Sequence, residues 1–135
     1  MIGYATVGTN DLDRARAFYD ALLAEIGARR VMEFDENGFT LYGTGRRSPG
    51  LAVTKPYDGN GASPGNGAMV ALAMDSRGTV DRLHQKAIAL GGSDEGAPGL
   101  RTPEGERAFY GAYFRDLDGN KLCAFCIGDP KPVSA

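Results

Sequence analysis

Histidine is almost absent from this sequence, which contains it only at position 84. Imidazole is a common ligand for zinc, nickel and iron, and it is the usual base that activates a catalytic cysteine. The single histidine therefore excludes a metal site built from several histidines of this chain. His84 falls inside a predicted helix, at the edge of its apolar stripe, so we expect it to be a half-exposed structural residue.

Cysteine is also scarce, with two residues that form one C-x-x-C pair, Cys123 and Cys126. A thioredoxin-like motif lies between a strand and a helix, whereas this pair lies in an apolar run after an Asp-Gly turn, which predicts a strand. Residues three apart on a strand point to opposite faces, so the two thiols are badly placed to form a disulfide or share a metal. We expect both cysteines to be buried and reduced.

Long apolar runs and clusters of basic residues are missing as well. No run approaches the roughly 20 residues of a membrane span, and residues 1–8 lack the basic-then-apolar order of a signal peptide. The formal net charge is -2, and the scattered Lys and Arg residues offer no face that would neutralise phosphates. These features argue against membrane and nucleic-acid partners and favour a globular, cytoplasmic protein.

The first half of the chain predicts a strand, a helix and three further strands. The apolar residues at 2–7 form a short strand, and the helix after it is capped at Thr9 or Asn10 and ends at Gly27. Turn residues then separate three more strands. Their expected ranges are 30–34, 39–42 and 51–54.

The same order begins again after a polar linker at 57–67. A strand at 68–74 precedes a helix that Asp75 or Ser76 caps and Gly91 and Gly92 end. The second strand of this half is weakly marked, near 93–95, and 96–105 is expected to form a loop. The other two strands are predicted at 109–115 and 122–127. The chain is thus predicted to be one α+β domain, 1–135, whose two βαβββ modules span 1–56 and 68–128, with a loosely ordered tail at 129–135.

Three stretches make the chain resemble the vicinal oxygen chelate superfamily of glyoxalases, bleomycin resistance proteins and dioxygenases. They are TVGTNDLDRARAFYDALL at 6–23, MVALAMDS at 69–76 and YFRDLDGNKLCAF at 113–125. The last is similar to the family's F-x-D-P-D-G-N-x-x-E pattern. The resemblance implies a glyoxalase-like fold in which each module forms half of a cup, and a homodimer whose modules pair across chains.

In that family the metal ligands come from the first and last strands of both modules. The motifs align Tyr4, Met69 and Cys123 with three of these positions, and the strand at 51–54 supplies the fourth, most plausibly Val53. A phenol, a thioether, a thiol and an isopropyl group provide no imidazole or carboxylate, which zinc, nickel, manganese and iron(II) require. We therefore expect no metal and no other cofactor.

Strand alternation extends these positions to a predicted cup lining. Val7, Val70, Leu72, Phe114 and Leu122 have the opposite phase and are expected to face the helices. Arg101 and Arg115 are candidates for clamping an anionic group or for surface charges. The catalytic residues, if there are any, are not identified. The expected ligand-binding residues are Tyr4, Thr6, Val53, Met69, Ala71, Tyr113, Cys123 and Phe125.

Three functions follow as hypotheses. The leading one is a small-molecule-binding protein that uses the cup without a divalent metal. The alternative is a metal-dependent lyase, isomerase or dioxygenase resembling glyoxalase I, which would require ligands at other positions. The third is an interaction module with a filled cup. Asp116 and Asp118, which superficially suggest a calcium loop, are interpreted as turn-forming residues.

Overall fold

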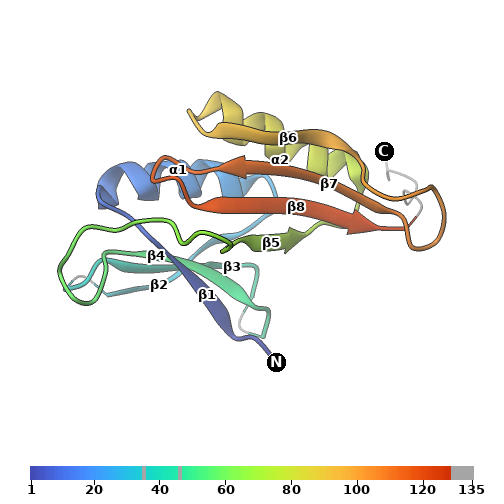
Figure 1. Cartoon of the computed structure of the whole chain (residues 1–135). Coiled ribbons are helices and arrows are strands. Elements are labelled where there is room, and N and C mark those ends of the chain that lie inside the picture. The colour runs from blue at the N-terminus through green and yellow to red at the C-terminus, as the bar shows by residue number, and fades with distance from the viewer. Residues whose placement is uncertain (35, 46, 129–135) are drawn as a thin grey trace.

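The computed structural model describes residues 1–34, 36–45 and 47–128. Two four-stranded sheets and two helices form the fold, with the order strand, helix and three strands occurring twice (Figure 1). The first module contains β1 (Tyr4–Gly8), α1 (Leu12–Ala24), β2 (Arg29–Phe34), β3 (Phe39–Gly43) and β4 (Gly50–Thr54). The second contains β5 (Val70–Ala73), α2 (Arg77–Ala89), β6 (Ser93–Leu100), β7 (Phe109–Arg115) and β8 (Lys121–Ile127). The predicted α+β fold of two βαβββ modules is confirmed.

Both sheets have the same topology. The first has the strand order β1-β4-β3-β2, and the second has the order β5-β8-β7-β6. In each, the first strand pairs parallel with the last, while the remaining pairs are antiparallel. Strand alternation then gives each sheet one face toward the helices and one face away from them.

The helices begin at polar caps. The side chain of Asp11 accepts a hydrogen bond from the backbone N–H of Arg14, so Asp11 caps α1. The expected cap was Thr9 or Asn10. Ser76 caps α2 in the same way through the N–H of Thr79. A side-chain oxygen at this position satisfies one of the free N–H groups of the first turn. Neither helix in the described part of the chain is long and apolar enough to cross a membrane.

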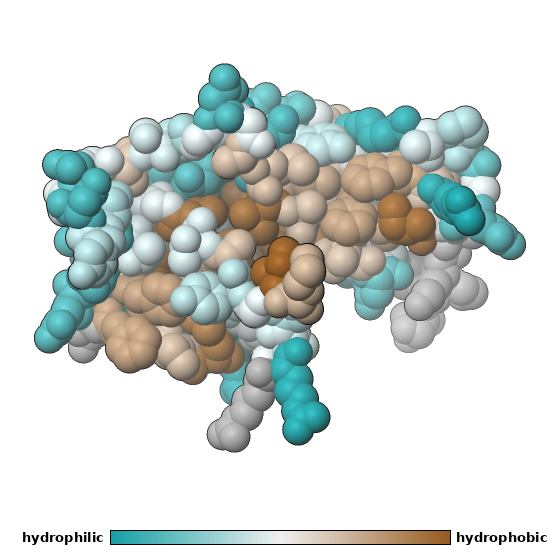
Figure 2. All heavy atoms as spheres, turned by 60° about the horizontal axis from the view of Figure 1, so that its bottom comes forward, coloured by the Kyte–Doolittle hydropathy of each residue, from teal (hydrophilic) through white to brown (hydrophobic). Residues whose placement is uncertain are grey.

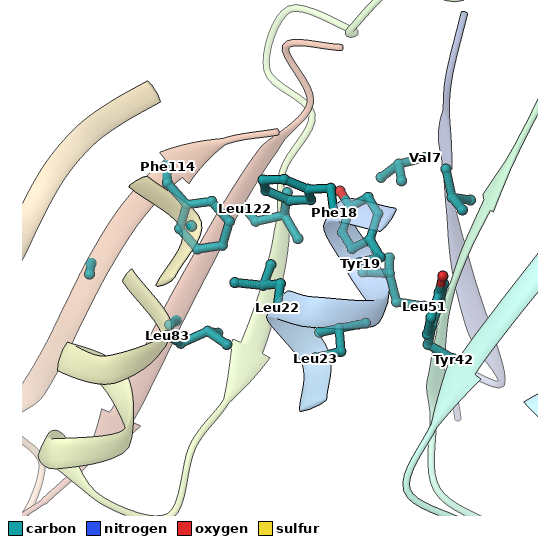
Figure 3. Packing of buried hydrophobic residues seen from close by; sticks show 14 of the residues in the cluster. Val7, Phe18, Tyr19, Leu22, Leu23, Tyr42, Leu51, Leu83, Phe114 and Leu122 are labelled. Atoms are coloured by element: carbon teal, nitrogen blue, oxygen red, sulfur yellow. The ribbon is translucent and has the colours of Figure 1, made fainter. Parts of the chain in front are cut away.

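The core lies between the two sheets, with α1 in the middle (Figure 3). Phe18 and Leu22 point toward the second module, while Tyr19 and Leu23 point toward the first sheet. All four are at most 2% exposed. Burial of each such side chain stabilises the fold by roughly 1.5–3 kcal/mol, so α1 joins the two modules into one domain. The side chains opposite α1 are Leu83, Phe114 and Leu122 on one side and Val7, Tyr42 and Leu51 on the other.

A polar junction also connects the modules. Asp116 accepts hydrogen bonds from the backbone N–H groups of Asp118 and Asn120, which confirms its predicted role in the turn. Its second oxygen accepts from the hydroxyl of Tyr19 in α1. The amide of Asn120 donates to the carbonyl of Gly8 at the end of β1. The turn before β8 is thereby attached to the beginning of the first module.

The segment at 96–105 differs from the expectation, because β6 continues to Leu100. The Gly-Ala-Pro-Gly sequence at 96–99 suggested a loop, but β6 is an edge strand, and an edge tolerates proline and glycine that a central strand would not. Register shifts interrupt its pairing with β7 on both sides of Gly96. The predicted tail at 129–135 lies outside the described residues.

Candidate functional site

The face of the first sheet that points away from the helices is apolar and open. We call it the first cup face, and its β-strand side chains are Tyr4, Thr6, Met32, Phe34, Phe39 and Leu41. All except Thr6 line a groove of about 1230 Å³ whose lining residues all lie between positions 3 and 50. The ring of Phe39 contacts those of Tyr4 and Phe34, with centroid distances of 5.6 and 6.0 Å. Tyr4, Met32 and Phe34 are nevertheless 54%, 47% and 58% exposed.

The corresponding face of the second sheet is the second cup face. Its side chains come from β5, β7 and β8, in the registered rows Ala71-Cys123-Tyr113 and Ala73-Phe125-Gly111. The rings of Phe109 and Phe125 stack with a centroid distance of 5.3 Å and an interplanar angle of 6°. Gly111 leaves room for this stack, because a Cβ there would lie 2.6 Å from Cε1 of Phe109. Figure 2 shows apolar side chains gathered over both sheets on the side turned toward the viewer.

Two cations flank Tyr113 on the second cup face. The guanidinium of Arg101 lies 5.5 Å from the centroid of the Tyr113 ring, and the ammonium of Lys121 lies 5.4 Å from it. Arg115, the other expected anion clamp, forms an ion pair with Glu95 at 2.6 Å and donates to the carbonyl of Gly119. Its charge is therefore already compensated, whereas Arg101 and Lys121 have no carboxylate partner among the described residues.

Cys123 lies under this cluster with no exposed surface. Burial raises the pKa of its thiol, and the smaller effects of the Tyr113 hydrogen bond and the two cations act in the opposite direction. Because a protonated thiol is a weak nucleophile, this environment favours a role in shaping the face over covalent catalysis. Cys126 is also buried and free, and it belongs to the core on the opposite side of the strand.

The prediction for Val53 is wrong. Val53 pairs with Val7 and Thr40, is 1% exposed and packs in the core toward the helices. Its neighbour Ala52 pairs with Thr6 and Leu41 and therefore has the phase of the first cup face. The error is one residue, and on a strand one residue reverses the side to which a side chain points.

The other expected lining residues are divided between the two cup faces. Tyr4 and Thr6 lie on the first, and Ala71, Tyr113, Cys123 and Phe125 lie on the second. Met69 precedes β5 and is 45% exposed. The residues expected to face the helices do so, because Val7, Phe114 and Leu122 are in the core and Val70 and Leu72 pack against it.

Sequence reasoning missed several side chains of these faces. Met32, Phe34, Phe39 and Leu41 line the groove of the first cup face, and the alternation of β2 and β3 was the signal that could have identified them. Lys121 was also missed, although it lies two residues from Cys123 and so shares its phase. The first omission arose because β2 and β3 were left out of the predicted lining, and the second because the last strand was expected to begin at 122 and not at Lys121.

The geometry and topology described above agree with comparisons to known proteins. A family model described as Glyoxalase/Bleomycin resistance protein/Dioxygenase superfamily matches residues 1–124. The chain belongs to this superfamily. A solved glyoxalase/bleomycin resistance protein from Albidiferax ferrireducens T118 is 35% identical, with a TM-score of 0.79 over 93% of this chain and 98% of that chain. A search of the curated proteins finds no match.

More distant superfamily structures share the fold. A V278E glyoxalase I mutant from Zea mays is 20% identical, with a TM-score of 0.71 over 95% of this chain and 45% of that chain. A lactoylglutathione lyase from Agrobacterium tumefaciens is 22% identical, with a TM-score of 0.64 over 93% and 92% of the two chains. At these identities the likeness concerns architecture and not activity.

The superfamily resemblance implies a metal, but the residues at the aligned positions do not fit a hard divalent ion. Tyr4, Met69 and Cys123 offer a phenol, a thioether and a buried thiol, and Ala52, which has the cup-facing phase in β4, offers no donor. Imidazole and carboxylate are the side chains that such ions prefer. Within residues 1–34, 36–45 and 47–128, no three His, Cys, Asp or Glu side chains gather closely enough to hold a metal.

Proposed function

We propose that this superfamily member binds a small molecule in its cup without a divalent metal. The observation that carries the proposal is the chemistry of the cup faces, because Tyr4, Met69 and Cys123, which the superfamily resemblance aligns with metal ligands, offer no imidazole or carboxylate. Tyr4, Phe39 and Phe34 on one face and the Phe109–Phe125 stack on the other offer flat surfaces for an apolar ligand. Such pockets bind by stacking and burial, with a few polar groups that orient the ligand.

The binding site is proposed to form between two copies of the chain. The groove of the first cup face is lined by residues of the first module alone, and the second cup face is built from the second module alone. A two-fold arrangement would place the first cup face of each copy against the second cup face of its partner, which gives two identical closed cups. Burial of the exposed Tyr4, Met32 and Phe34 supports this, at about 25 cal/mol per Å² of apolar surface removed from water.

Elemental analysis and thermal-shift screening of the purified protein test the proposal. We expect no stoichiometric nickel or zinc, and a saturable rise in Tm with at least one flat, partly apolar compound, because binding to the folded state raises its apparent stability. Stoichiometric metal together with turnover that a chelator abolishes would contradict the proposal and favour the lyase, isomerase or dioxygenase. A screen without any stabilising compound would favour the interaction module with a filled cup.

A pair of alanine variants shows whether the ligand binds on the cup face. Ala71 is exposed on the second cup face, and Ala89 is exposed on α2, outside both cup faces. We expect Ala71→Phe to occupy the cup and abolish the ligand-induced rise in Tm, while Ala89→Phe keeps it. Equal behaviour of the two variants would argue that the ligand binds elsewhere.

A further inference from the structure

Two cations without acidic partners meet at one aromatic ring on the second cup face. Arg101 approaches Tyr113 from β6 and its following loop, and Lys121 approaches from the start of β8. A cation over an aromatic face is held in place, but its charge is not neutralised. The position therefore concentrates positive charge beside an apolar surface.

The surrounding backbone is adapted to bring Arg101 to this ring. A Cβ at Gly96 would lie 3.0 Å from Cδ2 of Tyr113 and 3.3 Å from Nη2 of Arg101, so both side chains lie close over this glycine. A Cβ at Gly99 would lie 3.1 Å from Nη1 of Arg101. Nη2 of Arg101 also donates to the carbonyl of Ala97 at 2.6 Å. The guanidinium is thus oriented by β6, although the side chain is exposed.

Some cations of the described chain pair with a carboxylate, and Arg101 and Lys121 belong to those that do not. No acidic side chain among the described residues forms an ion pair with Arg101 or Lys121. Arg101 and Lys121 lie 5.5 and 5.4 Å from the centroid of the Tyr113 ring, so an anion bound beside this ring would be attracted by both positive charges. The arginines with an acidic partner are Arg14, Arg30, Arg77 and Arg115.

We infer that Arg101 and Lys121 form an anion-binding subsite beside Tyr113, and that the cup takes a flat, partly apolar ligand carrying a carboxylate or phosphate-type group. A guanidinium matches both kinds of oxyanion with paired N–H donors, and an ammonium adds a compact charge. The neighbouring Phe109–Phe125 stack provides the surface for the apolar part. This inference rests on the proposed function and specifies the chemistry of its ligand.

Three naphthalene probes of one shape and different charge test the subsite: 2-naphthoate, 2-naphthyl phosphate and the neutral 2-naphthamide. Their fluorescence can be followed directly, because the chain contains no tryptophan. At low salt we expect at least one of the two anions to bind the wild-type protein about tenfold more tightly than the amide, as charge-assisted hydrogen bonds predict. Preference for one anion identifies the carboxylate or the phosphate type, and added salt should weaken the preference by screening.

Substitutions then locate the effect. We expect Arg101→Gln combined with Lys121→Gln to reduce the preference for the anion to about twofold or less, while the affinity for 2-naphthamide stays unchanged. Each single variant should lose part of the preference. Lys86 lies on α2, at the other side of the second sheet. Lys86→Gln removes one positive charge, as each single variant does, but far from the subsite, and it should leave the preference for the anion intact.

The outcomes separate this inference from the proposed function. If the amide binds the wild-type protein as well as both anions, or the double variant keeps the preference, the subsite is wrong while binding in the cup stands. If none of the three probes binds although the thermal-shift screen has found a ligand, the subsite is wrong while binding in the cup stands. If the screen has found no ligand either, the proposed function fails and the subsite fails with it. Thermal unfolding of each variant shows that a loss of preference does not come from a loss of fold.

Discussion

The hydroxyl of Tyr19 in α1 donates a 2.5 Å hydrogen bond to Oδ2 of Asp116, which lies 97 residues later in the sequence. Both side chains are buried. Burial, and after it the negative charge of Asp116, raise the pKa of Tyr19 well above its ordinary value, so the hydroxyl remains a donor. This contact joins the turn of the second module to the helix of the first.

Loss of this contact is expected to destabilise the whole domain. Tyr19→Phe leaves a buried carboxylate with one donor fewer, and we expect it to lower the free energy of unfolding by about 1–3 kcal/mol. Asp116→Ala also removes the acceptor for the N–H groups of Asp118 and Asn120, and we expect about 3–5 kcal/mol. Urea unfolding measures both effects. Tyr57 is exposed, so Tyr57→Phe is the control. An equally small decrease in the free energy of unfolding for all three variants would contradict the stabilising role of the contact between Tyr19 and Asp116.

Asp20 provides a pH-dependent contribution to stability. Burial alone would raise its pKa, but hydrogen bonds from Arg30 and Tyr42 and the positive charge of Arg30 outweigh this and lower it. Arg30 binds both oxygens of Asp20 at 2.8 Å. A lowered pKa in the folded state stabilises the fold above the unfolded value of about 4, and this stabilisation is lost as pH falls toward the folded value.

Variants of this pair make the effect measurable. At pH 7 we expect Asp20→Asn to lower the free energy of unfolding by no more than about 1 kcal/mol, because solvent screens this partly exposed pair. The difference from wild type should shrink below about pH 4. A double-mutant cycle with Arg30→Gln should give a coupling energy at pH 7 that disappears in acid. A coupling that stays constant with pH would contradict the assigned charge interaction.

The same substitution is expected to affect stability at one glycine and not at another. A Cβ at Gly92 would lie 2.7 Å from the carbonyl oxygen of Arg115 and 2.8 Å from that of Ala87, and backbone atoms cannot move aside cheaply. We expect Gly92→Ala to lower the free energy of unfolding by about 1–3 kcal/mol. A Cβ at Gly45 would have no atom within 4 Å, so Gly45→Ala should change the free energy of unfolding by less than about 0.5 kcal/mol. Denaturant unfolding of the pair checks the difference, and equal stabilities would contradict the close packing.

Phe34 tests the proposed pairing of two chains. Its side chain is 58% exposed on the first cup face. We expect Phe34→Glu to place a charge in the apolar interface and to shift the protein from dimer to monomer, with at least a tenfold weaker association. Light scattering coupled to size-exclusion chromatography measures the mass across concentrations. Ile88→Glu, on an exposed side of α2, should keep the dimer, and a wild-type protein that is monomeric at every concentration would refute the pairing.

Much of the fold was predictable because its signals are local. Gly27 and Gly91 end the helices, and both have a positive φ that glycine adopts without strain. The strand at 96–100 was missed because Gly96 and Pro98 are poor strand residues in isolation. Only the position of β6 at the sheet edge makes them acceptable there.

The candidate site was predictable in chemistry but only partly in arrangement. The sequence by itself determined the repeated βαβββ order, the scarcity of metal-binding side chains and the apolar character of the cup faces, because these depend on residue type and periodicity. The tertiary structure alone decided that Val53 points into the core, that Tyr19 reaches Asp116, and that Arg101 and Lys121 meet at Tyr113. These depend on strand register and on which distant segments pack together, and a shift of one residue in register exchanges the two faces of a strand.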